Sequence, residues 1–318
     1  MWYYTVMRDP SIAVISGASS SHFPLVLGTF KSLLANAGQD LHLCCLDVGL
    51  EPNERQILAG MGVQLVEPEW DYPGEFPGPW FRAMSARPHL PRYFPGYDIY
   101  VWIDADCWLQ NRQALDSFIA AAQSHDVAAV AGIHMDYRQI ISVHPEKPGP
   151  LMQAYHSYLM QSLFPRGVAA KMMELPYLNG GVLALRAQST TWALWQEVLG
   201  PIYERGRTAK PAAWANARKD ETETPWKDVD NKAFFHGEEV ALNFAAYQSR
   251  VAVLDATCNW LCTQRVPAMN ADGKFITPGY SASEIGIIHM TAKTKHGAFR
   301  VRQPDGSFQL ISLRYPSS

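Results

Sequence analysis

The chain of 318 residues has a formal net charge of −3, and 47% of its residues are hydrophobic while 18% are charged. This composition is typical of a soluble globular protein with a substantial core. The chain has no basic cluster that would indicate nucleic-acid binding, and no apolar stretch approaches the roughly 18 residues of a spanning helix.

Strand-like and helix-like segments alternate along the first half of the chain. Short runs of apolar and β-branched residues predict strands that are buried on both faces, and segments with a helical period separate them. This alternation indicates an α/β fold with a mostly parallel sheet flanked by helices. The predicted strands are 11–16, 41–46, 63–66, 99–103 and 127–133, and the predicted helices are 25–36, 53–61, 81–90 and 114–123.

The second half continues the pattern with longer interruptions. Asp272-Gly273 and Asp305-Gly306 each lie between β-like runs and predict hairpins. No internal repeat is present, and every segment fits one sheet, so we expect one domain over 1–318. The predicted helices are 152–164, 190–199 and 238–247, the predicted strands are 182–185, 251–254 and 285–289, and the predicted loops or insertions are 67–79, 145–150 and 205–230.

Two carboxylates, Asp104 and Asp106, stand one residue apart directly after the predicted strand 99–103. In open α/β sheets, ligands bind beyond the carboxyl ends of the strands. Residues two apart on an extended chain point the same way, so these carboxylates repel each other unless a cation lies between them. Mn²⁺ or Mg²⁺ suits this place, because such ions are held by one or two carboxylates together with substrate phosphates.

Other interpretations of these acids remain open. They could cap a turn or the next helix without binding a metal. A phosphatase of the haloacid type also has Asp-X-Asp after a strand, but it requires threonine where this chain has Trp108. Zinc binding by Cys258 and Cys262 is a further alternative, although no second cysteine pair accompanies them.

The cysteines and the first residues of the sequence indicate the cellular compartment. The five cysteines are odd in number and have no framework spacing, and the first residues lack the basic head and apolar core of a secretory signal. We therefore expect a reducing, cytoplasmic setting. Trp2, Tyr3 and Tyr4 allow a peripheral membrane contact, with packing onto the sheet edge as the alternative. Nothing in the sequence indicates the oligomeric state.

Five motifs occur in a fixed order and together resemble the GT-A glycosyltransferases, specifically the retaining family-8 group that includes glycogenin and bacterial galactosyl- and glucosyltransferases. The resemblance covers about residues 11–300 and implies the GT-A fold, a Rossmann-like α/β fold with a mixed, mostly parallel sheet. The motifs are SSSHFPLVLGTFKSLLAN (19–36), RPHLPRYFPGYDIYVWIDADCWLQN (87–111), LNGGVLALRAQSTTW (178–192), HGEEVALNFAAY (236–247) and IGIIHMTAKTKHGAF (285–299).

The resemblance assigns the metal and diphosphate sites. His289 matches the histidine that completes the metal site with Asp104 and Asp106, and a neutral imidazole suits Mn²⁺ as a third ligand. Lys295 matches the lysine that offsets the charge of the departing nucleoside diphosphate, and Lys293 competes for that role. A core histidine without a ligand role is the alternative for His289. Ala292 replaces a glycine of the family motif.

The resemblance also assigns a nucleotide-binding set. Ser20 and His22 stand where the family has the aspartate and tyrosine that hold and stack the uracil, and His22 or Phe23 could still stack on the base. Arg87 stands eleven residues before Asp98, as the family's basic residue does. A surface arginine is the alternative for Arg87. The complete expected set is Ser16, Ser20, His22, Arg87, Ile103, Asp104, Ala105, Asn179, Gly180, Gly181 and Lys295.

Two further motifs lie where the family binds the donor sugar. Asn179 would offer its amide to a sugar hydroxyl, and Gly180 and Gly181 would allow the backbone to approach closely. Glu238 and Glu239 stand at the first Asp and the Gln of the family's Asp-Gln-Asp. A carboxylate at Glu239 could stabilise an oxocarbenium ion or attack it, so Glu238, Glu239 and Lys295 are the candidate catalytic residues. The alternative for the two glutamates is a helix N-terminus that favours acids.

These assignments predict a metal-dependent transferase that moves a hexose from a nucleotide-diphosphate sugar, a UDP-hexose by the resemblance, with retention of configuration. The acceptor could be a saccharide, a glycolipid or a protein. Two alternatives are a sugar nucleotidyltransferase, which would need a basic Gly-rich loop absent from 16–24, and a nucleotide-sugar-binding protein without transfer activity. The variable segments 134–178 and 205–235 are the expected acceptor side, and their candidate stacking residues are Tyr155, Tyr158, Tyr177, Trp214 and Trp226.

Overall fold

A computed structural model describes residues 9–38, 40–73, 76, 78–132, 137, 159–161, 163–208, 235–279 and 281–316. Most of the predicted helix 152–164 lies outside the described residues, as do the N-terminal aromatics and four of the five candidate stacking residues of the acceptor side. Tyr177 is the described member of that set. None of the described helices is both long and apolar enough to cross a bilayer.

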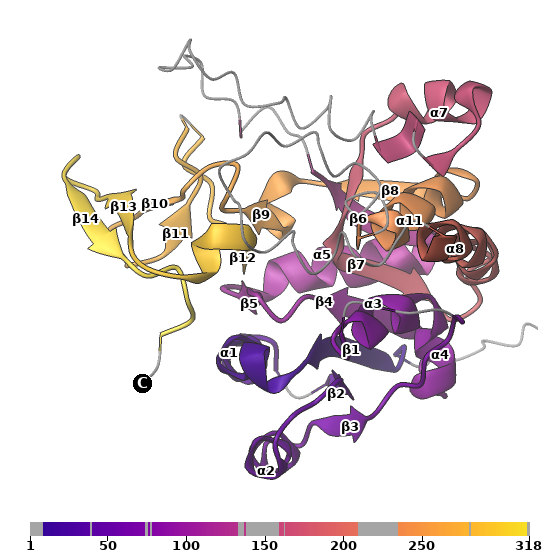
Figure 1. Cartoon of the computed structure of the whole chain (residues 1–318). Coiled ribbons are helices and arrows are strands. Elements are labelled where there is room, and N and C mark those ends of the chain that lie inside the picture. Colours follow the sequence, from indigo (N-terminus) through magenta and orange to yellow (C-terminus); the bar gives the residue numbers. More distant parts are fainter. Residues whose placement is uncertain are drawn as a thin grey trace, which may run out of the picture.

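A seven-stranded sheet forms the centre of the molecule, in the order β3-β2-β1-β4-β7-β6-β8 (Figure 1). Four of its six strand pairs are parallel, and only β7 runs against its neighbours β4 and β6. The mixed, mostly parallel α/β sheet predicted from the sequence is therefore confirmed. The strands are β1 (Ile12–Ala18), β2 (His42–Asp47), β3 (Gln64–Val66), β4 (Ile99–Ile103), β6 (Val127–Ala131), β7 (Leu178–Arg186) and β8 (Val251–Leu254).

Helices cover both faces of the sheet, because alternate residues of its apolar strands point to opposite sides. In β4, Val101 packs with α1 and α5 on one face, whereas Trp102 packs with α3, α8 and α11 on the other. The helices are α1 (Phe23–Asn36), α2 (Pro52–Gly60), α3 (Phe81–Ala86), α4 (Leu90–Tyr93), α5 (Arg112–Ser124), α7 (Arg166–Met173), α8 (Thr191–Thr208) and α11 (Gly237–Tyr247).

Short strands and 3₁₀ turns complete the described structure. The small sheet β5-β12-β9 lies directly beyond the end of β4, and the two hairpins β10–β11 and β13–β14 lie together at one end of the molecule (Figure 1). The strands are β5 (Cys107–Leu109), β9 (Trp260–Leu261), β10 (Ala268–Met269), β11 (Phe275–Ile276), β12 (Ile287–His289), β13 (Phe299–Arg302) and β14 (Phe308–Ile311), and the turns are η1 (Ser20–His22), η2 (Arg87–His89), η4 (Ala256–Cys258) and η5 (Ala292–Lys295).

The predicted elements differ from the observed ones mainly at their ends, but the prediction that every segment fits one sheet is wrong. The strand predicted at 285–289 forms β12 in the separate sheet β5-β12-β9, because it pairs with β5 and β9. Helix α8 continues to Thr208 through Pro201, although the polar composition from 205 onward indicated an insertion. Strand β7 begins four residues before the predicted start at 182, because Leu178 and Asn179 pair with β6 after a register shift. Both hairpins are confirmed, with Gly273 and Gly306 at φ +73° and +83°.

A polar contact fixes the start of β4 against β1. The backbone N–H and the hydroxyl of Ser11 donate to the Asp98 carboxylate at 2.8 and 2.9 Å. Asp98 therefore has a structural role at the start of the strand that carries the two aspartates at its other end.

Candidate active site

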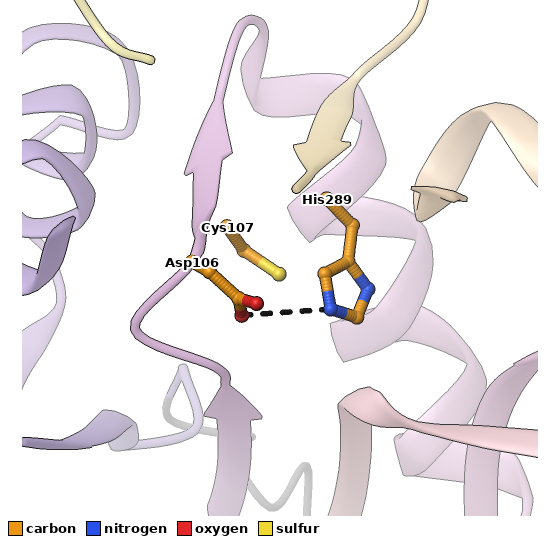
Figure 2. A group of neighbouring side chains, drawn as sticks. All are labelled: Asp106, Cys107 and His289. Atoms are coloured by element: carbon orange, nitrogen blue, oxygen red, sulfur yellow. Dashed lines mark ion pairs between the residues drawn. The ribbon is translucent and has the colours of Figure 1, made fainter. Parts of the chain in front are cut away.

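Two aspartates and a histidine converge at the carboxyl end of β4. Because β4 ends at Ile103, Asp104 and Asp106 lie in the turn that leads into β5. His289 is the last residue of β12 and lies opposite Cys107 of β5. Its Nε2 is 3.5 Å from Asp106 Oδ1 and 3.9 Å from Asp104 Oδ2, and Figure 2 shows the first contact. The structure thus brings together the three residues that the sequence predicts as metal ligands.

The two carboxylates have different surroundings. Burial raises the pKa of Asp106, but His289 and Lys295 outweigh burial and hold that pKa below its ordinary value. The Lys295 ammonium lies 2.8 Å from Asp106 Oδ2. Burial also raises the pKa of Asp104, and there the attraction of Arg87 does not compensate for it. Asp106 is therefore the firmly ionised member of the pair.

The donor atoms fit a hard divalent cation. Asp106, Cys107 and His289 each place a ligand atom within 4.8 Å of the others (Figure 2). Burial raises the pKa of the Cys107 thiol well above its ordinary value, and a soft sulfur ligand does not suit a hard divalent cation. Two carboxylates and one imidazole remain, a set of oxygen and nitrogen donors that suits Mn²⁺ or Mg²⁺.

Arg87 connects the aspartates to the helix α11. Its guanidinium donates to the Gly180 carbonyl at 2.7 Å, pairs with the Glu238 carboxylate, and lies 3.9 Å from Asp104 Oδ1. It also stacks 5.4 Å from the Trp102 ring centre. Glu238 is fully buried, so its described contact with the site runs through Arg87. A catalytic role for Glu238 stays a prediction.

Glu239 lies beside the two glycines of β7. Its Oε1 accepts hydrogen bonds from the Gly180 N–H at 2.8 Å and the Asn179 amide at 3.3 Å. Its Oε2 accepts from the Tyr177 hydroxyl at 3.2 Å. The helix α11 therefore presents this carboxylate to the strand segment that the sequence predicts as the sugar-binding one.

A cavity of about 380 Å³ opens in front of the aspartates. Aromatic side chains form much of its wall, and the sequence analysis identified none of Trp80, Trp102 and Phe235 as site residues. Trp102 lies in the buried strand β4, so the sequence pattern predicts a core residue there. The expected site residues that line the cavity are His22, Arg87, Asp104, Ala105, Asp106 and Lys295.

Six residues of the expected nucleotide set do not line this cavity, namely Ser16, Ser20, Ile103, Asn179, Gly180 and Gly181. The Ser20 hydroxyl bonds the Glu54 carboxylate and accepts from the Glu51 N–H at 3.1 Å, which ties η1 to the start of α2. The Ser16 side chain is fully buried within β1. His22 does face the cavity, where burial and then the Lys295 charge lower the pKa of its imidazole. We therefore expect a neutral ring at His22.

No family model matches the sequence, and no curated protein matches it. Among solved structures, the galactosyltransferase LgtC in complex with donor and acceptor sugar analogues matches with a TM-score of 0.51 and 13% identity, covering 89% of each chain. The bifunctional glycosyltransferase WbbM matches with a TM-score of 0.51 and 13% identity over 90% of this chain and 46% of that one. The chain has a GT-A glycosyltransferase fold. It spans about half the length of WbbM.

In this fold the Asp104-Ala105-Asp106 segment lies between β4 and β5, and β12 pairs with β5 beside it. At Ala292, the alanine that replaces a glycine of the family motif adopts a left-handed φ of +46°. Glycine adopts that conformation without steric cost. The backbone path expected for a glycine is thus retained here before Lys295.

Gly181 is the position where an added methyl group should disturb the site most directly. A Cβ at Gly181 would lie 2.1 Å from Cε1 of the buried His289 ring. We expect Gly181→Ala to displace that ring, to lower the free energy of unfolding by about 1–3 kcal/mol, and to weaken Mn²⁺ binding more than about tenfold. Denaturant unfolding and calorimetric titration with Mn²⁺ measure both effects.

Gly60→Ala is the matched control for this substitution, because a Cβ at Gly60 meets no atom within 4 Å. The control should unfold like the parent and bind Mn²⁺ equally well. Unchanged Mn²⁺ affinity in Gly181→Ala would show that His289 is not a ligand in its present position.

Proposed function

We propose that the protein is a metal-dependent glycosyltransferase that transfers a hexose from a nucleotide-diphosphate sugar, a UDP-hexose, to an acceptor. The observation that carries the proposal is the convergence of Asp104, Asp106, His289 and Lys295 at one end of β4, beside an aromatic-walled cavity. The GT-A fold adds to it, since the two matched structures of the same fold bear the names of glycosyltransferases.

The carboxylates and the imidazole would hold the cation. Asp104, Asp106 and His289 Nε2 supply three converging donors and leave the cavity side open to phosphate oxygens. A bound Mn²⁺ or Mg²⁺ would supply Lewis-acid neutralisation of the diphosphate leaving group. Lys295 bonds Oδ2 of Asp106, whereas His289 faces the other carboxylate oxygen, Oδ1.

Cationic and aromatic side chains around the cavity suit the nucleotide part of the donor. The side chain of Lys295 is mostly buried, and its ammonium group lies at the cavity wall, where it would offset charge on a departing diphosphate. Trp80, Trp102 and the neutral His22 offer flat faces for a base or ribose. The cavity volume of about 380 Å³ falls within the roughly 300–1,000 Å³ of small-ligand pockets.

The sugar would lie against β7 and the start of α11. The carboxylate of Glu239 is held by the Gly180 N–H and the Asn179 amide, with a fixed position next to the strand. Such a carboxylate could stabilise positive charge at the anomeric carbon or form a covalent bond to it, and either route is compatible with retention. The acceptor class, whether saccharide, glycolipid or protein, stays open.

A cytoplasmic location is part of the proposal. It rests on the cysteines, since Cys44, Cys45, Cys107, Cys258 and Cys262 are all buried free thiols. Free thiols are the usual state in a reducing compartment. The nucleotidyltransferase alternative is less well supported, because the turn after β1 (Ser19–His22) carries no lysine or arginine to hold a triphosphate.

A screen of nucleotide sugars tests the proposed function. With Mn²⁺ present, the correct donor should raise the unfolding temperature, because a ligand that binds the native state stabilises it. The same donor should then release nucleoside diphosphate slowly to water and faster with an acceptor, and only when Mn²⁺ is present. Stabilisation without any release would indicate a binding protein, and release of pyrophosphate from a nucleoside triphosphate would indicate a nucleotidyltransferase.

A further inference from the structure

Three consecutive side-chain hydrogen bonds join Glu239 to His289, two of them partly buried and the one at His289 buried. The Asn179 amide donates to Glu239 Oε1 at 3.3 Å, and the Asn259 amide donates to Asn179 Oδ1 at 2.9 Å. The Asn259 Oδ1 then lies 3.0 Å from His289 Nδ1. Asn259 and His289 are 0% and 2% exposed, so water does not compete for the contact between them. Asn259 belongs to none of the five motifs and directly follows η4.

The contact with Glu239 determines which side chain donates in each of these three hydrogen bonds. An ionised carboxylate can only accept hydrogen bonds, so the NH₂ group of Asn179 must face Glu239. The Gly181 N–H donates to Asn179 Oδ1 at 3.0 Å, which independently places that oxygen on the other side. Asn179 Oδ1 therefore receives the NH₂ group of Asn259. As a result, the carbonyl oxygen of Asn259 faces His289.

This arrangement has a consequence for the histidine. We propose that Asn259 is a positioning residue, because its carbonyl oxygen accepts a hydrogen bond from Nδ1–H of His289 and so turns Nε2 toward Asp104 and Asp106. A metal-binding histidine needs a free lone pair on the nitrogen that faces the ion, and the hydrogen bond of the other nitrogen selects this tautomer. The role of this tautomer in metal binding rests on the proposed function, whereas the position of the proton on Nδ1 does not depend on it.

Two acceptors compete for the ring proton. The Asp106 carboxylate lies 3.5 Å from Nε2, and the Asn259 oxygen lies 3.0 Å from Nδ1. Because Lys295 already bonds Asp106 at 2.8 Å, that carboxylate is partly satisfied. The backbone around Asn259 is held as well, since the Tyr137 hydroxyl donates to its carbonyl at 3.2 Å. Without the Asn259 oxygen, the proton would move to Nε2 and face Asp106, in the tautomer that excludes a metal.

The tautomer can be measured directly in metal-free protein. Nitrogen-15 NMR of histidine-labelled protein distinguishes protonated from unprotonated ring nitrogens, and comparison with His289→Gln identifies the His289 signals. We expect a protonated Nδ1 in the parent and a protonated Nε2 in Asn259→Leu. We also expect Mn²⁺ affinity to fall about 10–100-fold in Asn259→Leu.

Asn259→Asp is the conservative variant, because its carboxylate still accepts from Nδ1 but cannot donate to Asn179. It should keep the proton on Nδ1 and should bind Mn²⁺ within a few-fold of the parent. A parent protein with its proton on Nε2 would overturn the proposal, even if Asn259→Leu does not fold. A parent with the expected tautomer but no Mn²⁺ binding would instead contradict the proposed function and leave the positioning role standing.

Discussion

Replacing Asp106 with asparagine should lower metal-dependent release of nucleoside diphosphate about a thousand-fold while the protein remains folded. Asp106 is the ligand candidate with the lowered pKa, and His289 and Lys295 both face it. Asparagine keeps the shape and removes the charge. A cation site supplies several kcal/mol of charge stabilisation, and about 4 kcal/mol corresponds to roughly three orders of magnitude in rate. Release assays with and without Mn²⁺, together with circular dichroism, measure the two parts of this expectation.

Asp116→Asn is the control, because Asp116 pairs with Arg112 on the exposed face of α5 and 53% of its side chain is exposed. It should release nucleoside diphosphate at the parental rate. Full activity of Asp106→Asn, or of the parent in the presence of a chelator, would refute the metal assignment. Loss of activity with unchanged Mn²⁺ affinity would place Asp106 at the substrate without making it a metal ligand.

The metal-side half of the candidate site was predictable because its signals are local in sequence. An apolar strand followed at once by Asp104 and Asp106 places the acids at a sheet edge by elementary sheet geometry. His289 with Lys295 six residues later supplied the partner segment. The structure confirms that these residues meet, since β12 pairs with β5 in a register that puts His289 opposite Cys107.

The other half depends on side chains that meet only through tertiary packing. Strand β5 begins directly after the two aspartates and has only three residues, so its pattern is too short to separate it from the preceding strand. Trp102 lies in the buried strand β4 and Trp80 directly follows a loop rich in proline and glycine, and only the position of the cavity identifies them as site residues. Asn259 carries no motif, because its partners Asn179 and His289 lie in other elements.

The buried ion pair between Arg87 and Glu238 is the contact whose loss should cost the most stability. We expect Arg87→Met to lower the free energy of unfolding by about 3–5 kcal/mol, because it leaves the Glu238 carboxyl buried without an opposing charge. Glu238 is fully buried, and Arg87 is 6% exposed. Arg250→Met is the control, since 65% of the Arg250 side chain is exposed and its carboxylate contact is 3.7 Å long. That variant should lose less than about 1 kcal/mol.

The pH dependence of the Arg87→Met variant follows from the remaining carboxyl. Burial is the largest influence on Glu238 and raises the pKa of its carboxyl above the ordinary value, and Arg87 opposes this rise. Removing Arg87 therefore raises that pKa further. Since the folded variant then binds a proton that the unfolded chain releases, its stability is greatest at acidic pH and falls as the pH rises toward the folded-state pKa. Because the pKa of the Glu238 carboxyl is about 8 in the parent, both proteins keep its proton at pH 6. The deficit relative to the parent should therefore be larger at pH 9 than at pH 6.

A second substitution separates the charge from the packing. In the Arg87→Met background, Glu238→Gln removes the group that titrates, so the extra loss above about pH 8 should disappear and part of the stability should return. The double variant still lacks the guanidinium that donates to Gly180 and faces Asp104. Stability that recovers while nucleoside diphosphate release stays below that of the Glu238→Gln single variant would show that Arg87 acts at the donor site. Equal recovery of both would restrict Arg87 to the core, where its charge only serves Glu238.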